Sequence, residues 1–381
     1  MKRDAPKIAF CAGTSWYLWN FRRNVIRYFT EREWRVCLLA PEDAWTERLA
    51  ALSGANHIPW RVSLDGAAIV EEAGSLCRLH GALRRERPDF VLNHGIKANI
   101  YGGLSCRAQS IPYANVVSGL GMRISRPGIF ASALARLYTF ACSGGAALIV
   151  QNSSDLDFLR QNGLSPRVQV RQVMGSGVDL AHFTPEGEPG HGEPCFLFVG
   201  RLQEDKGIRE FVEAAAMVRR DFPSARFVVV GDAQHANSCA VGHDVLNGWR
   251  QQEVVEFVGR QEDVRPWIAS ATTLVMPSHG GEGMPKVILE AAAAGRPTIA
   301  SDVPGCRDAV LPGRTGWICA AKDAAALAEA MREALRTDPA RLAQMGTTAR
   351  EWAVEAFSDE EMARVAFELA EASMRRSSSL T

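Results

Sequence analysis

The sequence predicts an α/β protein made of two doubly wound domains. In each half of the chain, short runs rich in β-branched and aromatic residues alternate with longer helical patterns. Apolar strands separated by helices are typical of parallel sheets that are covered on both faces. A polar segment rich in proline and glycine, residues 183–194, interrupts the alternation once, and the pattern then starts again. The sequence therefore divides into two domains of similar size.

The first domain is expected to span residues 1–182. Each of its strands is a nearly continuous apolar run, which indicates burial on both faces. The strands are predicted at residues 7–12, 35–39, 90–93, 113–117, 147–150 and 168–173, with helical patterns at 67–87 and 129–142.

After the linker 183–194, the second domain is expected to span residues 195–356. Its strands are predicted at 195–199, 226–230, 256–258, 274–276, 297–300 and 317–319, and its helices at 207–220, 285–294, 324–336 and 339–356. Residues 357–381 are expected to form a last helix that packs back on the first domain. Ser358 followed by Glu361 is a capping box that opens this helix. Doubly wound domains bind ligands at the carboxyl ends of their strands, so we expect the site in a cleft between the domains.

Composition excludes several classes of protein. The 381 residues carry 43 basic and 43 acidic side chains and are 47% hydrophobic, which indicates a folded chain without the basic excess of a nucleic-acid binder. The nine cysteines include no CxxC pair and are expected to be buried thiols in a reducing compartment. No signal peptide and no apolar run of membrane-spanning length is found, so a cytoplasmic protein is expected.

The strongest chemical signal runs from Glu282 to Glu290. Seven residues separate the two glutamates, and Gly283 and Pro285 stand at a predicted strand-to-helix junction. Backbone N–H groups at the start of this helix would form an anion site. The alternative is that glutamate is simply common in the first turn of a helix.

A second signal, residues 200–207, directly follows the first strand of the second domain. Gly200 permits close approach to the backbone, and Arg201 and Lys206 place two cations in one loop. Two cations at such a place are typical of a diphosphate site. The alternative is a solvated loop balanced by Glu204 and Asp205.

Together, these two motifs resemble the retaining glycosyltransferase family 4. Residues 175–179, 302–306 and 313–316 add to the resemblance, which runs over nearly the whole chain. It implies the GT-B fold, in which two doubly wound Rossmann-like domains face a cleft. It also implies transfer of a sugar from a nucleotide sugar with retention at the anomeric carbon, without a metal or other cofactor.

The resemblance assigns roles to particular residues. Arg201 and Lys206 would bind and stabilise the donor diphosphate, and Glu282 would lie near the donor sugar. Glu290 would hold the ribose, and the backbone of Gly283 and Met284 would contact sugar and phosphate. In the first domain the resemblance implies a small-residue loop at Gly13 and a histidine near the sugar at His94, for which the alternative is a packing role. The sequence departs from the family at residues 279–281, His-Gly-Gly, and the Asp155–Asp157 pair is interpreted as structural.

The first domain is locally basic. Residues 90–154 contain no acidic residue but five cations, and residues 5–30 combine aromatic residues with Arg22, Arg23 and Arg27. This pattern favours contact with an anionic membrane surface, although buried helices also lack acids. The five cations are Lys97, Arg107, Arg123, Arg126 and Arg136.

Three segments, residues 14–16, 93–102 and 118–121, resemble the branch that extends undecaprenyl-diphosphate-linked sugars, including bacterial N-acetylgalactosaminyltransferases. The resemblance implies a UDP-N-acetylhexosamine donor and a lipid-linked saccharide acceptor in bacterial glycan, capsule or O-antigen assembly. Lys97, Arg123 and Arg126 are the candidate partners of the lipid diphosphate, and the protein is expected on the inner face of the plasma membrane. A transferase with a soluble acceptor, a nucleotide-sugar 2-epimerase and a non-catalytic sugar-binding protein are the alternatives.

Overall fold

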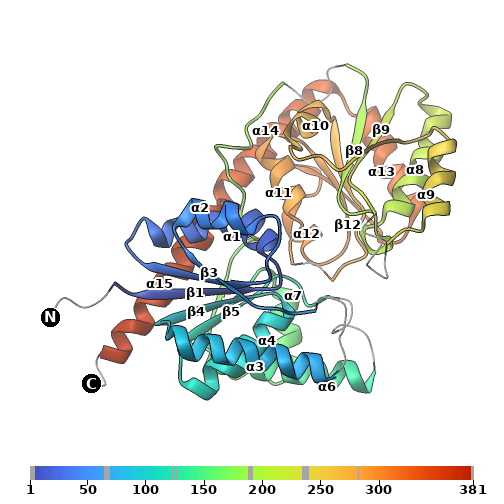
Figure 1. Ribbon diagram of the computed structural model, residues 1–381. Helices are drawn as coiled ribbons and strands as arrows, with labels where there is room; N and C mark the ends of the chain where they lie inside the picture. Colours follow the sequence, from blue (N-terminus) through green and yellow to red (C-terminus); the bar gives the residue numbers. More distant parts are fainter. Residues whose placement is uncertain are drawn as a thin grey trace. The chain divides into compact units, whose positions relative to one another are not determined.

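The computed structural model describes residues 5–63, 69–121, 124, 128–187, 192–233, 240–281 and 283–378. The chain divides into two compact units, one made of Met1–Gly177 with Asp359–Thr381 and the other of Val178–Ser358. Each unit has a parallel sheet with helices on both faces, as the fold class predicted from the sequence requires (Figure 1).

The sheet of the first unit has seven parallel strands in the order β3-β2-β1-β4-β5-β6-β7. The order reverses between β1 and β4, which is the topological switch point of a doubly wound sheet. The strands are β1 (Lys7–Ala12), β2 (Arg35–Ala40), β3 (Asn56–Pro59), β4 (Phe90–His94), β5 (Tyr113–Val117), β6 (Ala147–Val150) and β7 (Gln169–Gln172). The helices are α1 (Ser15–Thr30), α2 (Thr46–Ser53), α3 (Ile69–Glu86), α4 (Ile96–Gln109), α6 (Ile129–Ser143), α7 (Ser153–Gln161) and α15 (Asp359–Ser378).

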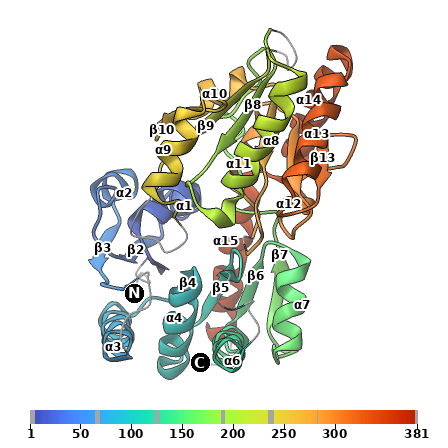
Figure 2. The ribbon, with the colours of Figure 1, turned by 90° about the vertical axis from the view of Figure 1, so that its right-hand side faces the viewer.

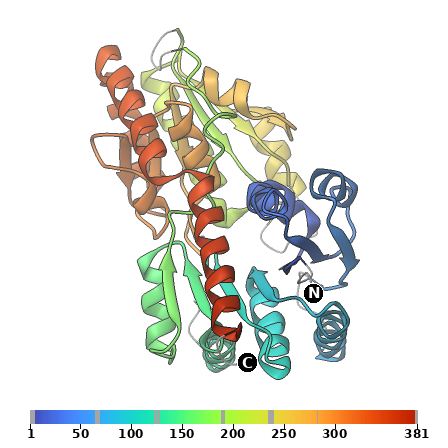
Figure 3. The ribbon, with the colours of Figure 1, turned by 90° about the vertical axis from the view of Figure 1, so that its left-hand side faces the viewer.

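Alternate residues of these strands serve the two faces of the sheet. Ile8 and Phe10 of β1 join a core with α1 and α15, whereas Ala9 and Cys11 join a core with α3 and α4. The helix α15, the red helix that ends the chain in Figure 3, packs on α1 and β4 of this unit. The C-terminal segment is thus part of the first unit.

The sheet of the second unit has six parallel strands in the order β10-β9-β8-β11-β12-β13, and the order reverses between β8 and β11. Figure 2 labels β8, β9, β10 and β13 of this sheet. The strands are β8 (Cys195–Val199), β9 (Arg226–Val230), β10 (Glu256–Gly259), β11 (Thr273–Met276), β12 (Thr298–Ser301) and β13 (Gly316–Cys319). The helices are α8 (Ile208–Asp221), α9 (His243–Gln251), α10 (Arg265–Ser270), α11 (Lys286–Ala293), α12 (Cys306–Ala309), α13 (Ala324–Arg336) and α14 (Pro339–Ala356).

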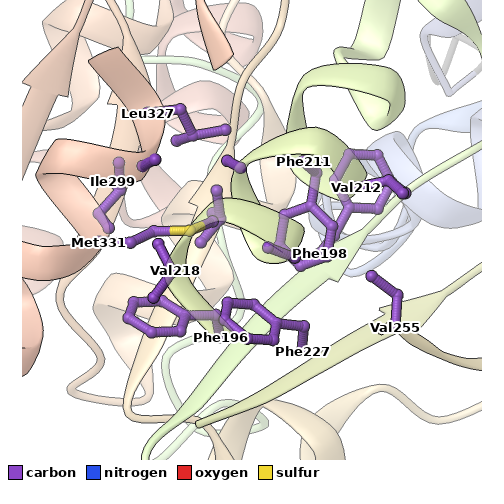
Figure 4. Close-up of a cluster of buried hydrophobic side chains, with 14 of the residues drawn as sticks. Phe196, Phe198, Phe211, Val212, Val218, Phe227, Val255, Ile299, Leu327 and Met331 are labelled. Carbon is purple, nitrogen blue, oxygen red and sulfur yellow. The ribbon is translucent and has the colours of Figure 1, made fainter. Parts of the chain in front are cut away.

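A cluster of phenylalanines holds β8 in place. Phe196 and Phe198 of β8 pack with Phe211 of α8 and Phe227 of β9, and Met331 of α13 closes the cluster (Figure 4). The rings of Phe196 and Phe227 are stacked with centroids 5.5 Å apart. Truncating one such buried ring costs about 3–5 kcal/mol of stability. The end of β8, where the cationic loop begins, is therefore rigidly supported.

The strand predictions agree with the structure at every strand except β3. β1, β5, β6, β8 and β9 occupy the predicted residues, and the other predicted strands differ by one residue at one end or, for β7 and β12, at both ends. β3 was not predicted, because Asn56 and Pro59 are atypical of strands. Such a sequence is tolerated at a sheet edge, and β3 is the edge strand next to β2 in the described sheet.

The boundary between the units falls after Gly177, whereas the sequence placed a linker at residues 183–194. Arg350 of α14 donates to the carbonyl oxygen of Phe183 at 2.8 Å. The buried Arg296 also donates to backbone carbonyls of this segment. These contacts hold the described part of the segment to the second unit.

Eight of the nine cysteines lie in the described residues, and all eight are free thiols. Seven are buried, and Cys77 is exposed. Burial raises the pKa of Cys37 to about 12 and that of Cys195 to about 11. Thiols with such pKa values are protonated at neutral pH and unreactive. The expectation of buried thiols is thus confirmed for seven of the eight described cysteines and is wrong for Cys77.

Candidate functional site

The cationic loop of the second unit, residues 200–207, begins where β8 ends. Because the strand order reverses between β8 and β11, the carboxyl ends of these two strands border the crevice where doubly wound sheets bind ligands. Arg201 is exposed, and Lys206 is buried at the end of the 3-10 turn Glu204–Lys206. Both cations predicted to bind a diphosphate lie at this edge of the sheet.

A second loop, residues 277–285, leads from β11 to α11 and touches the cationic loop. The backbone N–H of His279 donates to the carbonyl oxygen of Asp205 at 2.9 Å, and Ser278 Oγ donates to the same oxygen at 3.3 Å. Gly207 has φ of 74°, and a Cβ there would lie 1.9 Å from the carbonyl oxygen of Pro277. The loops approach this closely because residue 207 has no side chain.

The side chain of His279 contacts α8, the helix that follows the cationic loop. Its Nε2 is 3.0 Å from Oε1 of Glu210 on α8, and the two side chains are only 15% and 13% exposed. His279 was noted in the sequence as a departure from the family. The structure places its ring against α8.

The helix α11 begins directly after this loop. Pro285 is its N-cap residue, and Gly283 and Met284 are buried just before it. Glu290 is 14% exposed, with Oε1 3.7 Å from Nζ of Lys286 one turn earlier. Glu282 lies outside the described residues, so its predicted place near the donor sugar stays a prediction.

In the first unit, Gly13 and His94 meet at the switch point of the sheet. His94 ends β4 and pairs in register with Ala12, the last residue of β1, so Gly13 begins the adjoining loop. Thr14 caps α1 by accepting a hydrogen bond from the backbone N–H of Tyr17 at 3.0 Å. Gly13 and His94, which are far apart in the sequence, are thus neighbours at the edge where sheets of this type bind ligands.

The imidazole of His94 is enclosed by side chains of β1 and α1. Phe10 stacks on it with centroids 6.1 Å apart, and Tyr17 lies at 5.9 Å. Arg22 Nε donates to His94 Nδ1 at 3.1 Å. Burial lowers the pKa of His94 well below its usual value, and the positive charge of Arg22 contributes a smaller decrease. His94 is therefore neutral at pH 7.

The location of Arg22 corrects one expectation from the sequence. Arg22 was counted among the cations of a membrane-facing field, but its side chain is fully buried. It donates to His94, to the carbonyl oxygen of Phe21 and to the hydroxyl of Tyr17. Sequence reasoning missed this role because Arg22 and His94 are brought together only by the packing of α1 on the sheet.

Of the three candidate partners of the lipid diphosphate, the structure describes Lys97. Lys97, in the first turn of α4, forms an ion pair with Glu72 of α3, with Nζ 2.5 Å from Oε1. Tyr101 donates to the same carboxylate. Arg123 and Arg126 lie outside the described residues. The acid-free stretch thus receives an acidic partner from α3, which the local sequence around Lys97 does not reveal.

Helix α6 exposes apolar side chains in the same unit. Ile129 and Phe130 are 88% and 92% exposed, and Leu137 and Phe140 are also exposed. The guanidinium of Arg107 lies 4.1 Å from the centroid of Phe140. Over the ranges that the structure describes, no helix has both the length and the apolar composition needed to cross a membrane.

The carboxylates of the Asp155–Asp157 pair have local partners at the start of α7. Asn152 caps this helix by accepting from the backbone N–H of Asp155 at 2.7 Å. The amide of Asn152 in turn donates to the carboxylate of Asp155 at 3.0 Å. Arg160 Nη1 lies 3.3 Å from Asp157 Oδ1. These contacts agree with the structural interpretation of the pair.

Comparison with known proteins finds similarity to glycosyltransferases. Residues 193–337 match the family model "Glycosyl transferases group 1". The chain is 27% identical over 356 residues to the N,N'-diacetylbacillosaminyl-diphospho-undecaprenol alpha-1,3-N-acetylgalactosaminyltransferase of Campylobacter jejuni, covering 88% of this chain and 91% of that protein. It is 26% identical over 251 residues to the Escherichia coli UDP-Gal:alpha-D-GlcNAc-diphosphoundecaprenol alpha-1,3-galactosyltransferase, covering 62% of this chain and 64% of that one.

The fold is also similar to solved structures. Sucrose-phosphate synthase from Thermosynechococcus elongatus superposes with a TM-score of 0.80 at 20% identity, over 97% of this chain and 100% of that one. The matched domain contains the cationic loop, the β11-to-α11 loop and α11. Residues 193–337 therefore resemble a glycosyl transferases group 1 domain, and the chain has the two-sheet architecture of the GT-B glycosyltransferases.

Proposed function

We propose that this protein is a retaining, metal-independent glycosyltransferase with an undecaprenyl-diphosphate-linked saccharide as its acceptor. The donor is a nucleotide sugar, a UDP-N-acetylhexosamine, and the product belongs to a bacterial glycan, capsule or O-antigen. The observation that carries the proposal is the similarity to the Campylobacter jejuni enzyme, which covers both units. The second relative, whose name also includes a diphosphoundecaprenol acceptor, supports the same class.

The second unit contains the groups that this reaction needs on the donor side. Arg201 and Lys206 stand in one loop at the ligand-binding edge, and α11 directs its first backbone N–H groups to the same edge. In the proposed reaction these groups bind the donor diphosphate, and Glu290 binds the ribose. Fixed cations and a helix N-terminus stabilise a leaving diphosphate, so no metal or other cofactor is required.

The transfer exchanges one bond at the anomeric carbon for another on the same face. The bond from that carbon to the diphosphate oxygen breaks, and a bond to an acceptor hydroxyl oxygen forms. The hydroxyl proton is taken up by the released nucleotide diphosphate. Glu282 near the donor sugar and His94 at the edge of the first sheet are the proposed protein groups closest to the exchange.

The exposed side of α6 supports peripheral contact with the inner face of the plasma membrane. Leu137 lies seven residues after Phe130, and Phe140 three residues further on, so these side chains share a side of the helix. The helix contains no acidic residue, and Arg136 is exposed beside them. Apolar side chains flanked by cations suit the interface of an anionic bilayer.

Replacing Ile129 and Phe130 with serine is expected to weaken binding to phosphatidylethanolamine–phosphatidylglycerol vesicles by about tenfold or more, because burying each side chain contributes about 1.5–3 kcal/mol. Vesicle sedimentation measures the effect. Serine at Val245 and Val354, exposed valines of the second unit, is the matched control and should leave binding unchanged. Equal binding by the Ile129→Ser/Phe130→Ser variant and the wild type would show that α6 does not contact the membrane.

The function is tested by nucleotide release from a panel of UDP-, GDP- and dTDP-sugars in EDTA. Each donor is assayed with and without a polyprenyl-diphosphate-linked saccharide. Release that depends on the lipid, with labelled sugar appearing in the lipid fraction, is the expected result. Release that is indifferent to the lipid would indicate a soluble acceptor. Conversion of the donor to another nucleotide sugar would indicate an epimerase, and no turnover with any donor would contradict the proposal.

A further inference from the structure

The hydrogen bond between Arg22 and His94 defines which ring nitrogen of His94 carries the proton. A guanidinium has only N–H donors, so His94 Nδ1 must be the acceptor of the 3.1 Å contact from Arg22 Nε. An accepting nitrogen in a neutral imidazole is unprotonated, which leaves the single ring proton on Nε2. The ring is therefore a donor at Nε2.

Within the described part of the chain, no group accepts a hydrogen bond from that donor. His94 Nε2 is buried and has no hydrogen-bond partner among the described residues. A buried donor left without a partner costs about 1–3 kcal/mol. An apolar residue would fill the same space in the core without the cost of an unsatisfied donor. The unsatisfied N–H belongs to the residue that ends β4, at the switch point where this type of sheet binds ligands.

The position of Arg22 is itself fixed. Its side chain is fully buried and, besides His94, donates to the backbone carbonyl of Phe21 at 2.8 Å and to the Tyr17 hydroxyl at 2.9 Å. That hydroxyl lies 3.4 Å from Ser118 Oγ, beyond the end of β5. Arg22 and Tyr17, both on α1, are the charged and titratable side chains found in contact with His94 in the described residues. The network has one arrangement because each acceptor occupies a different N–H group of the guanidinium.

We propose that Arg22 is a positioning residue of the site, which holds His94 as a neutral hydrogen-bond donor, through Nε2–H, to an oxygen of the bound substrate. His94 then orients the substrate and does not remove a proton from it. The oxygen belongs to a sugar hydroxyl or to a phosphate group, which offer the same acceptor chemistry. The link to substrate rests on the proposed glycosyl transfer, whereas the state of the ring can be measured without turnover.

Two-bond ¹H–¹⁵N correlation spectra of the full chain with ¹⁵N-labelled histidine test the ring state, because they distinguish protonated from unprotonated ring nitrogens. His94→Gln identifies the signals of His94. We expect the Nε2–H tautomer, unchanged from about pH 5.5 to 8, a range in which an ordinary histidine titrates. An Nδ1–H tautomer, or titration of His94 within this range, would overturn the proposal.

Substitutions at Arg22 then test its role. Arg22→Met removes the donor and the charge, and we expect a mixture of tautomers and a kcat lower by roughly tenfold or more, because misplaced groups lose productive geometry. Arg22→Lys restores a charged donor and should recover the tautomer and most of kcat. Arg27→Met, the same change at an exposed arginine of α1, is the control. Wild-type tautomer and kcat in Arg22→Met would exclude a positioning role.

Adding UDP, a UDP-N-acetylhexosamine or the free sugar distinguishes the acceptor oxygen. A shift of the His94 Nε2 signal with UDP alone indicates phosphate, and a shift only with the nucleotide sugar or free sugar indicates a hydroxyl. If none of the three moves this signal while the enzyme turns over, His94 does not contact the donor and the proposal fails. If no transfer is detected with any donor, the proposed function fails. The NMR measurement of the His94 tautomer remains a separate test, because it does not depend on turnover.

Discussion

Arg201→Ala is expected to lower kcat/KM by roughly tenfold to a hundredfold, and the combined Arg201→Ala/Lys206→Met variant by roughly three orders of magnitude. Each charge-assisted hydrogen bond to a diphosphate contributes about 1.5–3 kcal/mol, and each 1.4 kcal/mol is a factor of ten in rate. The negative charge on the diphosphate grows as the sugar departs. A larger loss in kcat than in affinity would therefore show that the cations act mainly in the transition state.

Arg201 and Lys206 differ in burial, so they need different substitutions and different stability controls. Arg201 is exposed, so its removal should leave the melting temperature unchanged. Lys206 is buried, so methionine, which keeps the length of the side chain, replaces it and the melting temperature is measured alongside. Arg209→Ala is the matched control, because this nearby arginine pairs with Glu204 at 2.7 Å and stays partly exposed. An unchanged kcat/KM in Arg201→Ala would remove the assigned diphosphate site.

Gly207→Ala is expected to destabilise the second unit by about 2–5 kcal/mol, combining left-handed backbone strain with overpacking. The added Cβ would lie 1.9 Å from the Pro277 carbonyl oxygen, which belongs to backbone that cannot simply rotate away. Relief of this clash must separate the cationic loop from the loop that leads to α11. Glycosyl transfer should fall with stability, since the same two loops provide the proposed donor-binding groups.

Gly259→Ala is the control for this substitution. Gly259 has the same φ of 74°, but nothing lies within 4 Å of the position of its Cβ. It should cost only the backbone term of about 1–2 kcal/mol. Hydrogen exchange at the backbone N–H of His279, which donates to Asp205, reports the loop contact directly. Equal loss of stability and unchanged protection at His279 in both variants would show that the close approach is unimportant.

Local sequence was sufficient for most of the fold because the strands are buried on both faces. A continuous apolar run such as residues 195–199 has few alternatives to a central parallel strand, and β8 lies where it was predicted. The prediction failed at β3, where an edge position tolerates Asn56 and Pro59. The sequence also placed the division between the domains in the Pro/Gly-rich segment 183–194, whereas the two units divide after Gly177. Hydrogen bonds from Arg296 and Arg350, distant in sequence, hold the described part of that segment to the second unit.

The candidate site divides in the same way. The sequence by itself determined the cationic loop and the helix that follows β11, since their residues are close together along the chain. Only the tertiary structure showed that Lys97 pairs with Glu72 and that Arg22 donates to His94, a residue 72 positions away. A local pattern records the charge of a side chain but not its partner. Partners depend on how α1 and α3 pack against the sheet, and packing is decided by contacts between segments that no short window contains.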